Sequence, residues 1–153
     1  MVGWIPEELP VNEREYRPSA ALRRLDRLVG TWKVTGGAEG TVTYEWMNDF
    51  FLTQRVDLDH DGHRSTGLEI IGHSRPFGQG PSDDVVSRYY GSEGDTLDYV
   101  YEIDGDTLTI WGGERGSPAY YRGTFNAAGD AVDGAWVFPG GGGYESTMRR
   151  IGS

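Results

Sequence analysis

Two side chains in one extended run of the sequence could exchange a proton, Glu69 and His73. They lie four residues apart with Ile71 between them, and alternate residues of a β-strand share one face. If that face points into the fold, a carboxylate and an imidazole share an enclosed space and can donate and accept a proton near neutral pH. If Leu68 and Ile70 point inward instead, both groups are solvated. Apolar residues occupy both faces, so the sequence leaves the direction open.

A group of acidic residues could form a calcium site. Asp57, Asp59 and Asp61 precede a glycine with the alternation found in the first half of a calcium-binding loop. The second half departs from that pattern, since the twelfth position is Leu68 and the acid Glu69 comes one place late. A hairpin turn with solvated acids is favoured over calcium.

The histidines offer two further alternatives. His60 and His63 lie in the same turn and could bind a transition metal with Asp61, but a turn tip lacks the surrounding groups that orient metal ligands. A single inward histidine, His73, could ligate haem iron, although no other feature of a haem pocket accompanies it. We expect neither a metal ion nor a cofactor.

The strongest indication of a binding site comes from aromatic residues. Several tyrosines and tryptophans, with one glutamine among them, occupy the apolar phase of successive extended runs. Buried hydroxyl and amide groups need hydrogen-bonding partners, which a bound ligand or ordered water in a cavity can supply. The alternative is that these rings fill the interior and bond to one another. With His73, the candidate ligand-binding residues are Tyr44, Trp46, Gln54, Tyr99, Tyr101 and Trp136.

A two-residue period in hydrophobicity runs from Thr31 to Ile151 and indicates about ten strands. The runs are 31–35, 41–46, 52–58, 66–74, 84–91, 97–103, 108–110, 118–126, 132–138 and 143–151. Most are joined by short Asp-Gly or glycine-rich turns, which form hairpins. Successive hairpins that curl up and pair first with last make an all-β, antiparallel up-and-down β-barrel, which removes both sheet edges. A two-sheet sandwich is the alternative, but it usually needs longer crossovers.

The N-terminal part differs from the rest. Residues 1–18 contain three prolines and several large apolar residues, so we expect an extended arm lying against the barrel or a neighbouring subunit, with a frayed terminus as the alternative. Ser19 can cap a short helix over about 19–29, in which leucines recur at helical spacing. Residues 19–153 then form one domain. The long loop 74–84 is a candidate lid or rim.

Composition excludes several classes. The chain has 153 residues and no cysteine, so disulfides and thiolate sites are absent. Its net charge of −10 disfavours nucleic acid as a partner. No apolar run is long enough to cross a bilayer, and the first residues do not read as a signal peptide. We expect a cytoplasmic protein.

Residues 25–34, Leu-Asp-Arg-Leu-Val-Gly-Thr-Trp-Lys-Val, resemble the opening of lipocalins and fatty-acid-binding proteins. In those families a Gly-x-Trp begins the first strand, and the tryptophan, here Trp32, closes one end of the barrel. In lipocalins a basic residue from the last strand packs across that indole, and Arg149 or Arg150 stands where it would. A guanidinium on an indole face contributes about 0.5–2 kcal/mol.

The chain also departs from both families. It lacks the signal peptide, disulfide and C-terminal helix of secreted lipocalins, and the helix pair of fatty-acid-binding proteins. It looks closer to uncharacterised bacterial lipocalin-like proteins, in which the Gly-Thr-Trp start is followed by a Phe-Leu strand, here Phe51-Leu52, and a glycine-bounded strand, here 67–72. This calycin-type resemblance implies a fold more than an activity.

Three functional hypotheses follow. The first is a barrel that binds a small, largely apolar ligand. The second is an isomerase or cyclase in which Glu69 and His73, or a tyrosine, move a proton. The third is a scaffold that forms a homodimer through the 1–18 arm.

Overall fold

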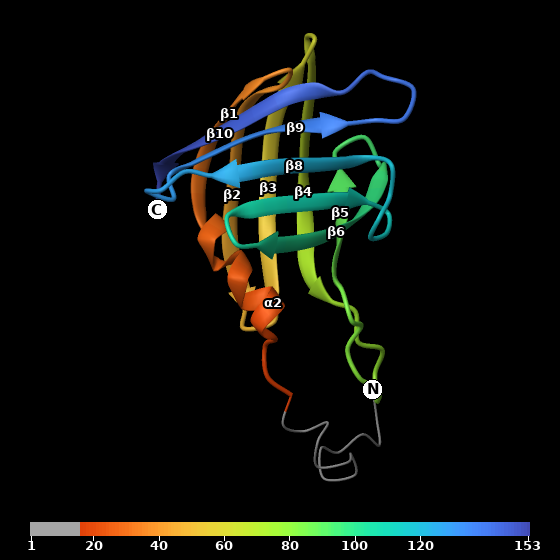
Figure 1. Cartoon of the computed structure of the whole chain (residues 1–153). Coiled ribbons are helices and arrows are strands. Elements are labelled where there is room, and N and C mark those ends of the chain that lie inside the picture. Colours follow the sequence, from red (N-terminus) through yellow and green to blue (C-terminus); the bar gives the residue numbers. More distant parts are fainter. Residues whose placement is uncertain (1–15) are drawn as a thin grey trace.

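The computed structural model describes residues 16–153 and shows a closed barrel of ten antiparallel strands preceded by one short helical segment (Figure 1). The strands are β1 (Gly30–Gly36), β2 (Glu39–Asn48), β3 (Phe51–His60), β4 (His63–His73), β5 (Val85–Gly91), β6 (Thr96–Asp104), β7 (Thr107–Gly112), β8 (Tyr120–Phe125), β9 (Ala131–Val137) and β10 (Tyr144–Gly152). The predicted arm falls almost wholly outside the described residues.

The wall is a meander in which each strand pairs with its neighbours in sequence, and β1 pairs with β10 to close it. In Figure 1, β2, β3 and β4 run vertically and β6, β8 and β9 horizontally, so the two halves of the wall cross. At the seam Val34 lies opposite Met148. The predicted ten-stranded barrel is confirmed, and the sandwich alternative is wrong. No helix within residues 16–153 is long and apolar enough to cross a membrane.

The helical segment lies where the sequence predicts it, but only its first turn is α-helical. The hydroxyl of Ser19 accepts a hydrogen bond from the Leu22 N–H at 3.0 Å, which caps α2 (Ala20–Arg23). The chain then tightens into the 3-10 helix η2 (Arg24–Leu28). Leu22, Leu25 and Leu28 are fully buried and pack into the core. The segment therefore covers one end of the barrel, called the closed end below.

The closed end is plugged by Trp32, which is fully buried and donates its indole N–H to the Leu28 carbonyl at 2.8 Å. The guanidinium carbon of Arg150 lies 4.2 Å from the centroid of this indole, and its nitrogens donate to the carbonyls of Val29 and Arg27. Of the two predicted arginines, Arg150 thus packs on the tryptophan. Arg149 is exposed on the outer face of β10.

Gly30 explains why a glycine precedes this tryptophan by two residues. Its φ is +128°, a region that L side chains rarely adopt, and a Cβ atom there would lie 2.5 Å from a guanidinium nitrogen of Arg150. The absent side chain therefore makes room for the arginine that covers Trp32.

Candidate functional site

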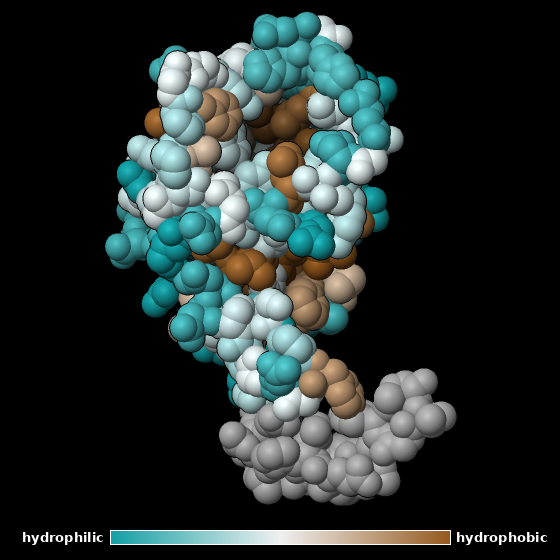
Figure 2. Space-filling view, turned by 90° about the vertical axis from the view of Figure 1, so that its right-hand side faces the viewer, coloured by the Kyte–Doolittle hydropathy of each residue, from teal (hydrophilic) through white to brown (hydrophobic). Residues whose placement is uncertain are grey.

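A cavity of about 340 Å³ lies inside the barrel on the side away from the helical segment. Its base is formed by Gln54, Glu69 and Tyr101, and its walls include Tyr89, Tyr99 and Trp136. The cavity opens between the β3–β4 and β5–β6 turns, at a mouth formed by His63, Ser92, Glu93, Asp95 and Tyr144. In Figure 2 the upper half of the molecule is hollowed, with hydrophobic side chains inside the hollow and mostly hydrophilic residues around it.

Glu69 is the centre of a buried hydrogen-bond network at the base of this cavity. Its side chain is on the inward face of β4, and the residue is only 3 % exposed. Ser87 donates its hydroxyl to Glu69 Oε2 at 2.5 Å, and the Tyr101 hydroxyl also hydrogen-bonds to this carboxyl group. Tyr101 in turn bonds to Tyr44, which accepts a hydrogen bond from Gln54 Nε2 at 2.8 Å.

The direction of these bonds follows from counting hydrogens. The Gln54 amide nitrogen can only donate, so the Tyr44 oxygen accepts this hydrogen bond. The Tyr101 hydrogen then goes to Glu69, as does that of Ser87. Both of these hydroxyls donate to one carboxyl group. They form an arrangement suited to a carboxylate.

Burial raises the pKa of Glu69 to about 7, and the hydrogen bonds from Ser87 and Tyr101 offset part of that rise. Burial also raises the pKa values of Tyr44, Tyr99 and Tyr101, so these phenols stay protonated donors at neutral pH. Glu69 is thus the group at the base of the cavity that gains or loses a proton near neutrality.

No ion pair formed within residues 16–153 involves Glu69. The groups that interact electrostatically with it are the phenols of Tyr44, Tyr89, Tyr99 and Tyr101. Among the described residues, the carboxylate therefore has hydrogen-bond donors but no countercharge.

The seven predicted ligand-binding residues separate into three groups: four line the cavity, one lies behind its base, and two lie at the closed end. Gln54, Tyr99, Tyr101 and Trp136 line the cavity, as predicted. Tyr44 is buried and reaches the site through Gln54 and Tyr101.

The prediction that Trp46 lines the cavity is wrong. Trp46 is on the inward-facing side of β2. It lies near the closed end, where its indole N–H donates to the Asp26 carboxylate at 2.8 Å. Alternation along a strand defines the face of a residue and not its depth along the barrel.

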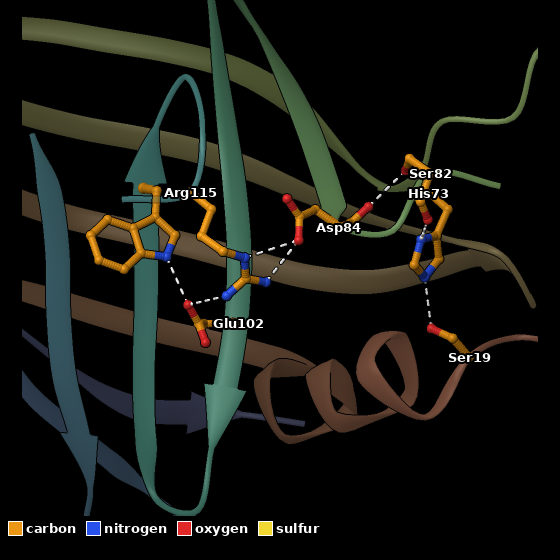
Figure 3. Close-up of polar contacts among 7 residues, drawn as sticks. Ser19, His73, Ser82, Asp84, Glu102 and Arg115 are labelled. Atoms are coloured by element: carbon orange, nitrogen blue, oxygen red, sulfur yellow. Dashed lines mark hydrogen bonds and ion pairs between the residues drawn. The ribbon is translucent and has the colours of Figure 1, made fainter. Parts of the chain in front are cut away.

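His73 also lies at the closed end and not in the cavity. Its Nε2 is 2.7 Å from the Ser19 hydroxyl, and its Nδ1 is 2.8 Å from the Ser82 carbonyl oxygen (Figure 3). A carbonyl can only accept, so Nδ1 donates to Ser82, while Nε2 hydrogen-bonds with the Ser19 hydroxyl. Both ring nitrogens are engaged, so neither is left for haem iron. Glu69 and His73 share a face but stand about 13 Å apart along β4, so the predicted proton-transfer pair is not assembled.

The same polar contacts hold the 74–84 loop at the closed end. Figure 3 shows them continuing from Ser82, whose hydroxyl donates to the Asp84 carbonyl, to the carboxylate of Asp84, which accepts from Arg115 at 2.8 Å. Arg115 also donates to Glu102 at 2.7 Å. The loop thus lies beside the helical segment and away from the mouth, which is not where a lid for the cavity would lie.

Replacing His73 with alanine is expected to lower the free energy of unfolding by about 1–2 kcal/mol, because the helix cap and the 74–84 loop lose their shared partner. Denaturant unfolding followed by circular dichroism measures this loss. His63→Ala is the matched control, since His63 makes only an exposed contact with Glu93 at 3.4 Å, and it should cost little. A greater loss from His63→Ala than from His73→Ala would contradict this assignment.

The acidic turn joins β3 and β4 in a hairpin, the interpretation that the sequence favoured over a calcium loop. Asp57 pairs with both Nε and Nη2 of Arg64, at 2.8 and 2.9 Å, and this contact lowers the pKa of Asp57. Asp59 accepts from the Gly62 N–H at 2.8 Å, which closes the turn. The ring of His60 packs on the ring of Tyr144, with 4.8 Å between the two ring centroids. Across residues 16–153, no three carboxylate or imidazole side chains gather closely enough to hold a metal ion.

Sequence reasoning missed Ser87, the donor closest to Glu69. The signal was present, because Val85, Ser87 and Tyr89 alternate with the exposed Arg88 on β5. A serine among inward residues indicates a polar partner inside the barrel.

No protein-family model matches the chain, and a search of curated proteins found no match.

Proposed function

We propose that this protein is a lipocalin-like barrel that binds a small, largely apolar ligand in its interior. The observation that carries the proposal is the cavity of about 340 Å³, which lies inside a barrel that Trp32 plugs at one end, and which opens to the surface at the other end. This volume is at the lower end of the range for small-molecule sites, so the ligand is small.

The walls of the cavity support a ligand with a flat apolar body. The Trp136 ring lies 6.1 Å from Tyr99 and 5.4 Å from Tyr121, and both contacts are tilted. Such aromatic walls contribute a large apolar contact area with little loss of side-chain freedom. The polar groups lie together at the base, where Gln54 and Glu69 can fix the orientation of one end of the ligand.

The resemblance of residues 25–34 to the opening of lipocalins supports the same proposal. In those families the tryptophan and the arginine close one end of a barrel, and Trp32 and Arg150 are in contact here. A barrel that is plugged at one end and open at the other suits a protein that encloses its ligand.

A substitution that fills the cavity tests the proposal. Ser65 lines the cavity and is on the same inward-facing side of β4 as Glu69. Ser65→Phe therefore places a ring in the space that a ligand would occupy. We expect it to weaken binding of the uncharged fluorescent probe N-phenyl-1-naphthylamine at least about tenfold, because the probe and the new ring compete for one volume. Probe fluorescence during titration measures the affinity.

Thr96→Phe is the matched control, because Thr96 is exposed on the outer face of β6 opposite Tyr90. It adds the same ring outside the barrel and should change the affinity less than about twofold. Equal loss in both variants, or no saturable binding by the unmodified protein, would refute an interior site.

A further inference from the structure

The base of the cavity is acidic and has no positive partner. Glu69 is buried, and the polar groups around it are hydroxyls and an amide, from Tyr44 on β2, Gln54 on β3, Ser87 on β5 and Tyr101 on β6. Removing a carboxylate from water costs several kcal/mol unless a cation compensates it. The neutral donors offset part of this desolvation cost. The cavity next to Glu69 leaves space for a cation that would offset the rest.

We propose that the ligand carries a protonated amine, which binds Glu69 at the base of the cavity while the apolar body contacts Tyr99 and Trp136. This inference rests on the ligand-binding function proposed above and names the chemical class of the ligand.

The lone pairs of Glu69 leave room for such a group. A carboxylate has about four acceptor sites, and two are used by the hydroxyls of Ser87 and Tyr101. An ammonium group supplies N–H donors and the missing positive charge in one contact. A hydrogen bond of this charge-assisted kind strengthens binding by roughly tenfold or more.

The walls and the mouth favour the same charge. The faces of tyrosine and tryptophan rings attract cations, and Tyr99 and Trp136 line the path to Glu69. At the mouth, Glu93 and Asp95 are acidic, and His63 lies within 3.4 Å of Glu93. The net charge of −10 also draws cations toward the protein. A carboxylate or phosphate ligand would be repelled at every step.

The pH dependence follows from the groups that face Glu69. The titratable ones are phenols, from Tyr44 on β2, Tyr89 on β5, and Tyr99 and Tyr101 on β6, which stay protonated near neutrality. Glu69, with a pKa of about 7, is therefore the interior group that changes charge. Cation affinity should fall about tenfold from pH 8 to pH 6, as Glu69 takes up its proton.

Three probes with one ring system and different charge test the inference on the full chain. They are naphthalen-2-ylmethylammonium, naphthalen-2-ylmethanol and 2-naphthoate, each titrated by isothermal calorimetry. At pH 8 the ammonium should bind about tenfold more tightly than the alcohol, and the naphthoate should bind most weakly. At pH 6 the advantage of the ammonium should be largely lost.

Glu69→Gln keeps the shape of the side chain and removes its charge, so it should weaken binding of the ammonium about tenfold and that of the alcohol less than about twofold. Retained binding of the alcohol also shows that the variant folds. Glu45→Gln is the control, because Glu45 is exposed on the outer face of β2. This substitution removes the same net charge from the protein without changing the cavity. It should leave the preference for the ammonium unchanged.

The outcomes separate the two proposals. Equal binding of ammonium and alcohol, a preference for naphthoate, or an ammonium preference that survives Glu69→Gln overturns the cationic ligand and leaves an apolar binding barrel. If none of the probes and no N-phenyl-1-naphthylamine bind, the ligand-binding function itself is wrong.

Discussion

Replacing Trp32 with alanine is expected to lower the free energy of unfolding by about 3–5 kcal/mol, the range for removing a large buried aromatic side chain. The indole is fully buried at the closed end, and the substitution leaves a void between the helical segment and the barrel. It also removes the ring beneath the Arg150 guanidinium and the partner of the Leu28 carbonyl. Denaturant unfolding followed by far-ultraviolet circular dichroism measures this loss.

Trp111→Ala is the matched control for Trp32→Ala. Trp111 is half-buried on β7, and its indole N–H donates to Glu102 at 2.7 Å. Removing it takes away one hydrogen bond and a partly exposed ring, so we expect a loss of about 1–2 kcal/mol. If the two variants lose equal stability, Trp32 does not hold the closed end together.

Glu69→Gln is expected to stabilise the protein by about 3 kcal/mol at pH 8, because it removes a buried charge that has no countercharge. The pKa of Glu69 rises from the ordinary 4.5 to about 7 on folding. The folded protein thus holds this proton more tightly than the unfolded chain, and stability is lost as pH rises from about 4.5 to 7. Below pH 4.5 both states are protonated, and the gain from the variant should shrink below about 1 kcal/mol.

Parallel unfolding curves for the parent and the variant between pH 4 and pH 8 measure this difference. Other carboxylates titrate in the same range, but they are common to both proteins and cancel in the comparison. Glu45→Gln should show no such pH-dependent gain, because its carboxylate is exposed. A constant difference between parent and Glu69→Gln across the range would show that Glu69 does not titrate near neutrality.

Much of the fold was predictable from the sequence, because a barrel repeats one simple pattern. Alternation of apolar and polar residues predicted the strands, and short Asp-Gly turns predicted their antiparallel order. The sequence could not choose between Arg149 and Arg150, since the choice depends on the register across the seam. In the structure, the register that pairs Val34 with Met148 also places Arg150 opposite Trp32.

The candidate site was less predictable, and β4 shows why. Leu68 and Ile70 on one face are as apolar as Ile71 on the other, so hydrophobicity did not reveal that Glu69 points inward. Depth was a second unknown, because a period of two residues assigns His73 to the same face as Glu69 and does not say which end of the barrel it reaches. The register across neighbouring strands, a long-range property, supplied both answers.

The seam between β1 and β10 has a consequence for how the chain reaches this structure. The contact of Arg150 with the Val29 carbonyl joins residues 121 positions apart. One edge of β1 therefore stays unpaired until β10 has been synthesised and pairs with it. Contacts so distant in sequence slow folding, and an uncovered strand edge invites pairing with other chains. During synthesis β1 remains unpaired on that side until β10 leaves the ribosome, so the nascent chain exposes a strand edge that is prone to aggregation until then.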